Sequence, residues 1–77
     1  MDIAKGSVVI AKAGRDKGKE FVVIDVPDSR TALICDGKSR PLERPKRKNV
    51  IHLQATGTTV DCITTNRQLR ILLKNYS

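Results

Sequence analysis

Apolar positions between residues 6 and 53 come in short runs that are rich in β-branched side chains. The runs cover residues 8–10, 21–26, 32–35 and 50–51, and each is about as long as a β-strand. Turn-forming residues separate them, including two glycines within residues 14–18, Pro27-Asp28-Ser29 and Asp36-Gly37. The pattern predicts short antiparallel strands around a small core, in a barrel that removes sheet edges by closing on itself.

The C-terminal part of the chain has a helical period instead. Large side chains recur at helical spacing at Leu69, Leu72, Leu73 and Tyr76. Thr65-x-x-Gln68 fits a capping box just before them. We expect one amphipathic helix at about residues 65–75, with its leucines packed on the barrel. Binding of a partner to the leucine stripe is the alternative.

The chain has 77 residues, which predicts a single domain over residues 1–77, with the barrel at about 5–55. A chain this short buries only about 60% of its unfolded surface, so its core is modest. No stretch approaches the ~18 apolar residues of a membrane helix, and residues 1–3 open no signal-peptide pattern. We therefore expect a cytoplasmic protein without a membrane partner.

The formal net charge of +7 is concentrated in one segment. Residues 1–37 carry six bases and six acids, residues 38–48 six bases and one acid, and residues 49–77 a net +2. The six bases of residues 38–48 are Lys38, Arg40, Arg44, Lys46, Arg47 and Lys48. Prolines at 41 and 45 favour a loop or ragged edge there over a central strand. The segment is either a binding site for a polyanion or a solvated surface.

A second group of cations surrounds two glycines, Gly14 and Gly18, between the first two predicted strands. These cations are Lys12, Arg15, Lys17 and Lys19. Glycine lets the backbone turn with positive φ and approach a ligand closely, and the bases would supply charge to a phosphate. A tight hairpin kept soluble by its lysines explains the same residues. The spacing is not that of a P-loop, because no Gly-Lys-Ser/Thr ending follows.

Residues 6–25, GSVVIAKAGRDKGKEFVVID, resemble a KOW motif, the strand–loop–strand element of ribosomal and transcription-elongation proteins. Gly18 matches the signature glycine of that motif. Residues 46–53, KRKNVIHL, resemble the region after the third strand in small KOW proteins of the archaeal and eukaryotic large ribosomal subunit, the "fourteen-e" type, which have bacterial look-alikes. Residues 61–75 resemble the tail of that group more loosely. Phe21 stands where many elongation-type motifs carry another glycine, which favours the ribosomal subgroup.

The resemblance implies a mainly β protein with an SH3-like (KOW) barrel that binds RNA, usually ribosomal RNA, through the KOW loop and nearby basic segments. Only two aromatic residues occur, Phe21 in an apolar run and Tyr76 near the end. The chain therefore lacks the stacking platform of single-strand readers, and we expect backbone recognition of folded RNA. The predicted RNA-binding residues are Lys12, Gly14, Arg15, Lys17, Gly18, Lys19, Lys38, Arg40, Arg44, Lys46, Arg47 and Lys48.

Other chemistry finds little support in the sequence. Cys35 and Cys62 lie 27 positions apart without a C-x-x-C pair, and with His52 they stay one ligand short of a structural zinc site. We expect both thiols to be reduced, Cys35 to be a core residue, and His52 to lie on a strand as a surface or satisfied side chain. No catalytic pair is visible, so we expect neither an enzyme nor a bound metal or cofactor.

Two functions remain open at this stage. The first is a ribosomal or ribosome-associated protein, monomeric when free, that binds folded ribosomal RNA. Ribosomal proteins are further candidate partners. The second is an adaptor that docks an acidic protein surface in the translation or transcription machinery. An architectural DNA-binding role is weaker, because nothing resembles a recognition helix or a minor-groove wedge.

Overall fold

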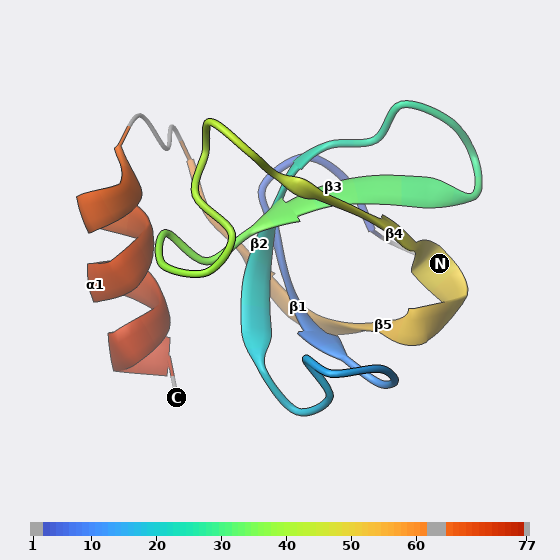
Figure 1. Ribbon diagram of the computed structural model, residues 1–77, viewed down its shortest axis with the longest axis horizontal. Helices are drawn as coiled ribbons and strands as arrows, with labels where there is room; N and C mark the ends of the chain where they lie inside the picture. The colour runs from blue at the N-terminus through green and yellow to red at the C-terminus, as the bar shows by residue number, and fades with distance from the viewer. Residues whose placement is uncertain (1–2, 62–64, 77) are drawn as a thin grey trace.

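The computed structural model describes residues 3–61 and 65–76, and for residues 75 and 76 only the backbone. Its elements in chain order are β1 (Ser7–Ala11), β2 (Glu20–Asp25), β3 (Thr31–Cys35), β4 (Lys46–Asn49), the 3₁₀ helix η1 (Val50–His52), β5 (Leu53–Thr59) and α1 (Asn66–Tyr76). The strands form one antiparallel sheet in the order β4-β3-β2-β1-β5. Figure 1 shows the sheet curling round on itself, with α1 standing against one side. The predicted class is confirmed: a mainly β, SH3-like antiparallel barrel with a C-terminal helix.

The central strands β1 and β2 are buried on both faces, which explains their uninterrupted apolar runs. Inside the curled sheet, Val9, Phe21 and Ile34 belong to one core cluster. On the outer face, Val8 and Val22 pack with the helix in a second cluster. Phe21 is fully buried, as its apolar run predicted, so its ring is not available for stacking on a base.

The helix α1 forms where the sequence predicted it, and the capping box is confirmed. The Thr65 backbone N–H donates to Gln68 Oε1 at 3.1 Å, and the Gln68 N–H donates to Thr65 Oγ1 at 3.1 Å. Leu69 and Leu73 are buried against the outer face of the sheet, and Leu72 is partly buried beside them. The leucine stripe therefore packs on the barrel. Tyr76 was predicted to continue the spacing of the leucines, and its side chain lies outside the part of the chain that the structure describes.

Two local predictions are wrong. Residues 50–51 form part of η1 and not a strand, because Asn49 caps a tight turn there by accepting a hydrogen bond from the Ile51 N–H at 3.0 Å. His52 accordingly lies on η1 as an exposed residue and not on a strand. Strand β5 has the polar sequence LQATGTT and was not predicted, because only Leu53 in it is buried. It pairs with β1 at the edge of the sheet.

In the described part of the chain, no helix is both long and apolar enough to cross a membrane.

Candidate nucleic-acid interface

The loop at residues 12–19, called the KOW loop below, is closed at its base by two backbone hydrogen bonds. The Gly18 N–H donates to the Ala11 carbonyl at 2.8 Å, and the Ala11 N–H donates to the Lys19 carbonyl at 3.0 Å. Gly18 has φ of +87° with no atom near the position of an added Cβ, so the backbone conformation alone requires glycine there. The exposed cations of the loop are Lys12, Arg15, Lys17 and Lys19.

A buried acid lies at the centre of this cationic loop. Asp16 is only 7% exposed. Its Oδ2 lies 3.5 Å from Arg40 Nη2, and its Oδ1 lies 3.8 Å from Lys19 Nζ. Arg40 Nε is also buried and has no hydrogen-bond partner among the residues that the structure describes. Asp16 therefore holds a cation of the basic segment against the KOW loop. This role of Asp16 was not predicted from the sequence, although a lone acid among four bases marked the position.

A second cation of the basic segment, Lys48, also contacts the KOW loop. It lies on β4 opposite Ala32, a residue of the inner core, so both side chains project from the same face of the sheet. The Lys48 Nζ donates to the Ala13 carbonyl at 3.0 Å. The same nitrogen lies 3.2 Å from the position that a Cβ on Gly14 would occupy. The two predicted sites, the KOW loop and the basic segment, are thus in direct contact through Arg40 and Lys48.

The other bases of residues 38–48 are less closely connected with the loop. Lys46 lies on the same face of β4 as Lys48, whereas Arg47 projects from the opposite face and is exposed. Arg44 is exposed in a turn, where its N–H donates to the Pro41 carbonyl at 2.9 Å. Lys38 is exposed in the turn after β3. Within residues 3–61 and 65–76, no side-chain hydrogen bond or ion pair joins Lys38, Arg44, Lys46 or Arg47 to the loop.

Arg47 lies within electrostatic reach of the turn between β2 and β3. The pKa of Asp28 in that turn lies below its usual value, first because its carboxylate accepts a hydrogen bond from the Arg30 N–H. Hydrogen bonds from Thr31 lower the pKa further, and the charge of Arg47 adds a smaller effect. Arg47 therefore extends the basic surface away from the KOW loop.

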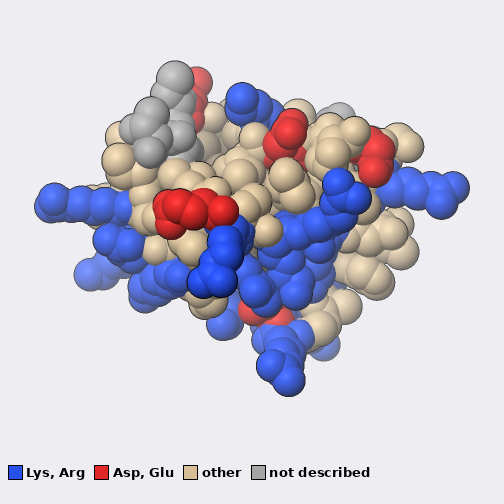
Figure 2. Space-filling model, turned by 45° about the horizontal axis from the view of Figure 1, so that its top comes forward, with Lys and Arg blue, Asp and Glu red and all other residues tan. Residues whose placement is uncertain are grey.

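Figure 2 shows how the charges are distributed over one face of the molecule. Lysine and arginine side chains form a nearly continuous belt across the middle and lower part of this view, from the side where α1 lies to the centre. Acidic side chains are scattered, mainly along the upper part of the same face. This face thus presents enough cations to meet several phosphates.

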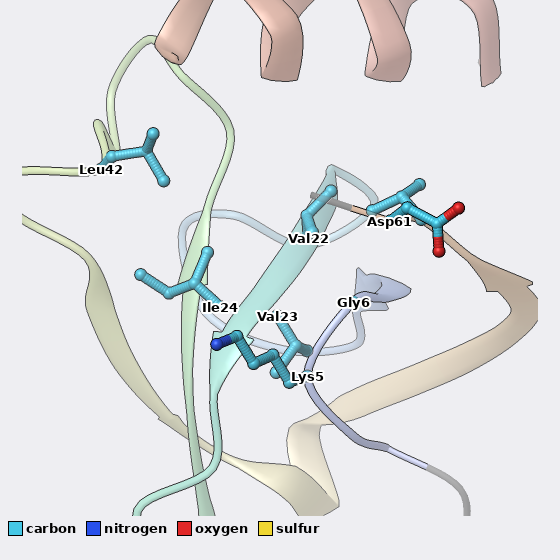
Figure 3. A pocket seen from close by; sticks show the side chains of 8 residues that line it. Lys5, Gly6, Val22, Val23, Ile24, Leu42 and Asp61 are labelled. Atoms are coloured by element: carbon cyan, nitrogen blue, oxygen red, sulfur yellow. The ribbon is translucent and has the colours of Figure 1, made fainter. Parts of the chain in front are cut away.

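A separate pocket of about 430 Å³ lies on the outer face of β2. Figure 3 shows Val22, Ile24 and Leu42 around it, with Lys5 and Asp61 at its rim. The lining is mainly apolar, with one base and one acid. This pocket lies apart from the predicted RNA-binding residues, none of which lines it.

Cys35 is a free, buried cysteine of the outer core, as its apolar strand predicted. Burial raises the pKa of its thiol to about 11, with smaller effects of Asp36 and Glu43. Cys62, its possible partner as a soft metal ligand, lies outside the described residues. Within the part of the chain that is described, no three His, Cys, Asp or Glu side chains gather as a metal site would require.

A curled five-stranded sheet, a glycine-framed cationic loop between β1 and β2, and a basic edge strand together define a small KOW-type barrel. No protein-family model matches the chain. Curated proteins do: the chain is 30% identical over 59 residues to the large ribosomal subunit protein eL14 of Metallosphaera sedula. It is 32% and 34% identical over 56 residues to the eL14 proteins of Pyrobaculum islandicum and Pyrobaculum arsenaticum.

These matches cover 77% of the chain for the Metallosphaera protein and 73% for the two Pyrobaculum proteins. The matched region spans 62% of the Metallosphaera relative and 54% of each Pyrobaculum relative, so it corresponds to little more than half of those proteins. The similarity confirms the resemblance to the KOW ribosomal proteins of the large subunit.

Proposed function

We propose that this protein binds folded ribosomal RNA as a ribosomal or ribosome-associated protein of the translation machinery in the cytoplasm. The observation that carries the proposal is the contact of Arg40 and Lys48 with the KOW loop, which places cations from two distant segments around one glycine-framed turn. The names of the relatives, all large ribosomal subunit proteins, support the same function. Ribosomal proteins are further candidate neighbours.

In this proposal, Arg15, Lys17 and Lys12 contact phosphates directly, because they are exposed on the KOW loop. An arginine guanidinium can bind a phosphate through two parallel N–H donors, whereas a lysine acts as a compact charge. Arg44 and Arg47 extend the footprint along the edge of the sheet. The ring of Phe21 is buried and cannot stack on a base, so in this proposal recognition depends on the phosphate backbone and on RNA shape.

Barrel and helix act as one domain in this proposal. Leu69 and Leu73 of α1 share a buried cluster with Val8 and Val22 of the sheet. Burying each leucine side chain stabilises the folded state by about 1.5–3 kcal/mol, so the helix would not separate from the barrel under ordinary conditions. The protein binds as a monomer and catalyses no reaction.

Sedimentation of the tagged protein with a cell lysate through a density gradient tests the proposed function. We expect the protein to migrate with ribosomal subunits at low salt, and to return to the top fractions after raised salt or ribonuclease treatment. The variant Arg15→Gln/Lys17→Gln is expected to migrate less with the subunits, whereas the matched variant Lys5→Gln/Arg30→Gln, with the same loss of charge away from the KOW loop, is expected to migrate as the wild type does. Association that survives ribonuclease would instead favour the adaptor function.

A further inference from the structure

We propose that α1 forms one wall of a second phosphate-binding site, so that the bound RNA runs from the KOW loop onto the helix. The site is a groove of about 650 Å³ between α1, the start of β2 and the turn after β3. This inference rests on the proposed function and adds to it the helix α1, whose Arg70 and Lys74 are not among the predicted RNA-binding residues.

Four cations from three separate segments line the groove: Lys19, Lys38, Arg70 and Lys74. Two acids, Glu20 and Asp36, line it as well, which leaves an excess of two positive charges. Asp36 has a structural role, because its Oδ1 accepts hydrogen bonds from the backbone N–H groups of Lys38 at 2.8 Å and Arg40 at 2.9 Å. The carboxylate thus shapes the turn that presents Lys38 to the groove.

The two walls of the groove are fixed against each other at Gly37. This glycine is buried and has φ of +82°, and a Cβ there would collide with the Asn66 carbonyl oxygen and lie 3.0 Å from the Leu69 Cβ. Arg70 Nη1 donates to the Gly37 carbonyl at 2.9 Å. Close approach of the turn to α1 therefore holds Arg70 and Lys38 beside the same groove. Preorganised cations lose less conformational entropy when a phosphate binds.

The groove is continuous with the KOW loop through Lys19. This residue lines the groove, and its ammonium lies 3.8 Å from the Asp16 carboxylate, which also pairs with Arg40. Figure 2 shows the belt of lysine and arginine reaching from the side of α1 to the centre of the face. A single RNA strand that contacts the loop and the groove in succession would pass over Lys19, which belongs to both.

The lining chemistry favours a nucleic-acid backbone over a protein surface. Among the described residues that line the groove, the one large apolar side chain is that of Leu73, and it is only 8% exposed. Protein interfaces depend on aromatic or aliphatic anchors that fill pockets, whereas most side chains that line this groove are charged. A phosphodiester chain needs cations and hydrogen-bond donors instead, and the Ser39 hydroxyl adds a donor to those of the four bases.

Filter binding of the purified protein to purified ribosomal RNA of the source organism, over a range of salt concentrations, tests this site. The variant Lys38→Gln/Lys74→Gln removes two groove cations. The control Arg30→Gln/Arg67→Gln removes the same charge from two exposed positions that do not line the groove. If two phosphates are lost, the log–log salt slope should become less steep by about 1.4–1.8, which corresponds to about 25- to 60-fold weaker binding at 0.1 M salt.

The control variant should keep the wild-type slope. A groove variant that keeps it too, while Arg15→Gln/Lys17→Gln weakens binding, overturns the groove and leaves the proposed function standing. Equal losses in the groove variant and its control would show that only total charge matters, which also overturns it. Failure of the wild-type protein to bind ribosomal RNA would remove both proposals. Thermal melting of each variant checks folding, and the single variant Lys74→Gln, at an exposed position of α1, keeps the test decisive if the double variant is unstable.

Discussion

Replacing Lys48 by methionine separates the positioning of the KOW loop from the effect of net charge. Methionine keeps most of the aliphatic stem beside Ala32, so packing against the inner core changes little. The substitution removes the ammonium and with it the hydrogen bond to the Ala13 carbonyl at 3.0 Å. Arg47→Met is the matched control, because it removes one positive charge from the next residue of the same strand, whose side chain points to the other face.

The size of the effect follows from the single contact that is lost. A hydrogen bond from a charged donor in a partly solvated position contributes about 1 kcal/mol to stability. In a domain of this size, that free energy corresponds to a fall in Tm of about 4–8 °C. Arg47→Met should leave Tm nearly unchanged, because its side chain is exposed. If Arg47 contacts one phosphate, its loss weakens RNA binding about eightfold at 0.1 M salt.

Thermal unfolding followed by circular dichroism measures the first effect, and amide hydrogen exchange in residues 13–17 reports on the loop itself. We expect Lys48→Met to lower Tm and to speed exchange in the KOW loop while β3 stays protected, and Arg47→Met to do neither. Equal melting temperatures and equal loop exchange in the two variants would refute the reasoning. The contact between Lys48 and Ala13 would then not stabilise the KOW loop.

Three further predictions concern the parts of the fold that position the site. Gly37→Ala should destabilise the protein by at least about 1 kcal/mol in denaturant unfolding, because an added Cβ meets the Asn66 carbonyl at positive φ; wild-type stability would contradict the close packing of turn and helix. Thr65→Ala should cost about 1 kcal/mol in the same assay, whereas Gln68→Glu, which preserves a capping box, should cost less; equal losses would speak against the cap. Cys35 should resist alkylation at pH 8 until urea unfolds the chain, as mass spectrometry of its peptide would show. Because its pKa is raised to about 11 in the folded state, its contribution to stability should be complete below about pH 9 and decline as the pH rises toward 11, and rapid alkylation of the folded protein would contradict this.

Local signals were sufficient for some elements and insufficient for others. β2 was predictable because an apolar run long enough for a strand lies between two turns, and α1 because Thr65 and Gln68 mark its start. β5 escaped prediction because an edge strand needs few apolar residues when its partner β1 supplies the buried surface. Residues 50–51 were wrongly predicted to form a strand, because β-branched residues also fit a short 3₁₀ turn when Asn49 caps it.

The site was predictable in its residue types but not in its arrangement. Glycines and clustered bases can be read directly from the sequence, and Gly14 and Gly18 have the positive φ that glycine permits. The contact between Lys48 and Ala13 joins residues 35 positions apart, so it depends on the order of the strands in the sheet. The burial of Asp16 depends equally on the approach of Arg40 from another loop. Contacts of this kind depend on the folded sheet, so local sequence patterns do not predict them.

Equilibrium binding of the purified protein to purified ribosomal RNA, measured from about 50 to 300 mM salt, tests the central claim most directly. If the KOW loop and the basic segment neutralise about four to six phosphates, the logarithm of the association constant should fall with the logarithm of salt concentration with a slope of about −3 to −5. Arg15→Gln/Lys17→Gln should make that slope less steep by about 1.4–1.8. A slope near zero, or a slope that the substitution leaves unchanged, would contradict the proposal that these cations hold the RNA backbone.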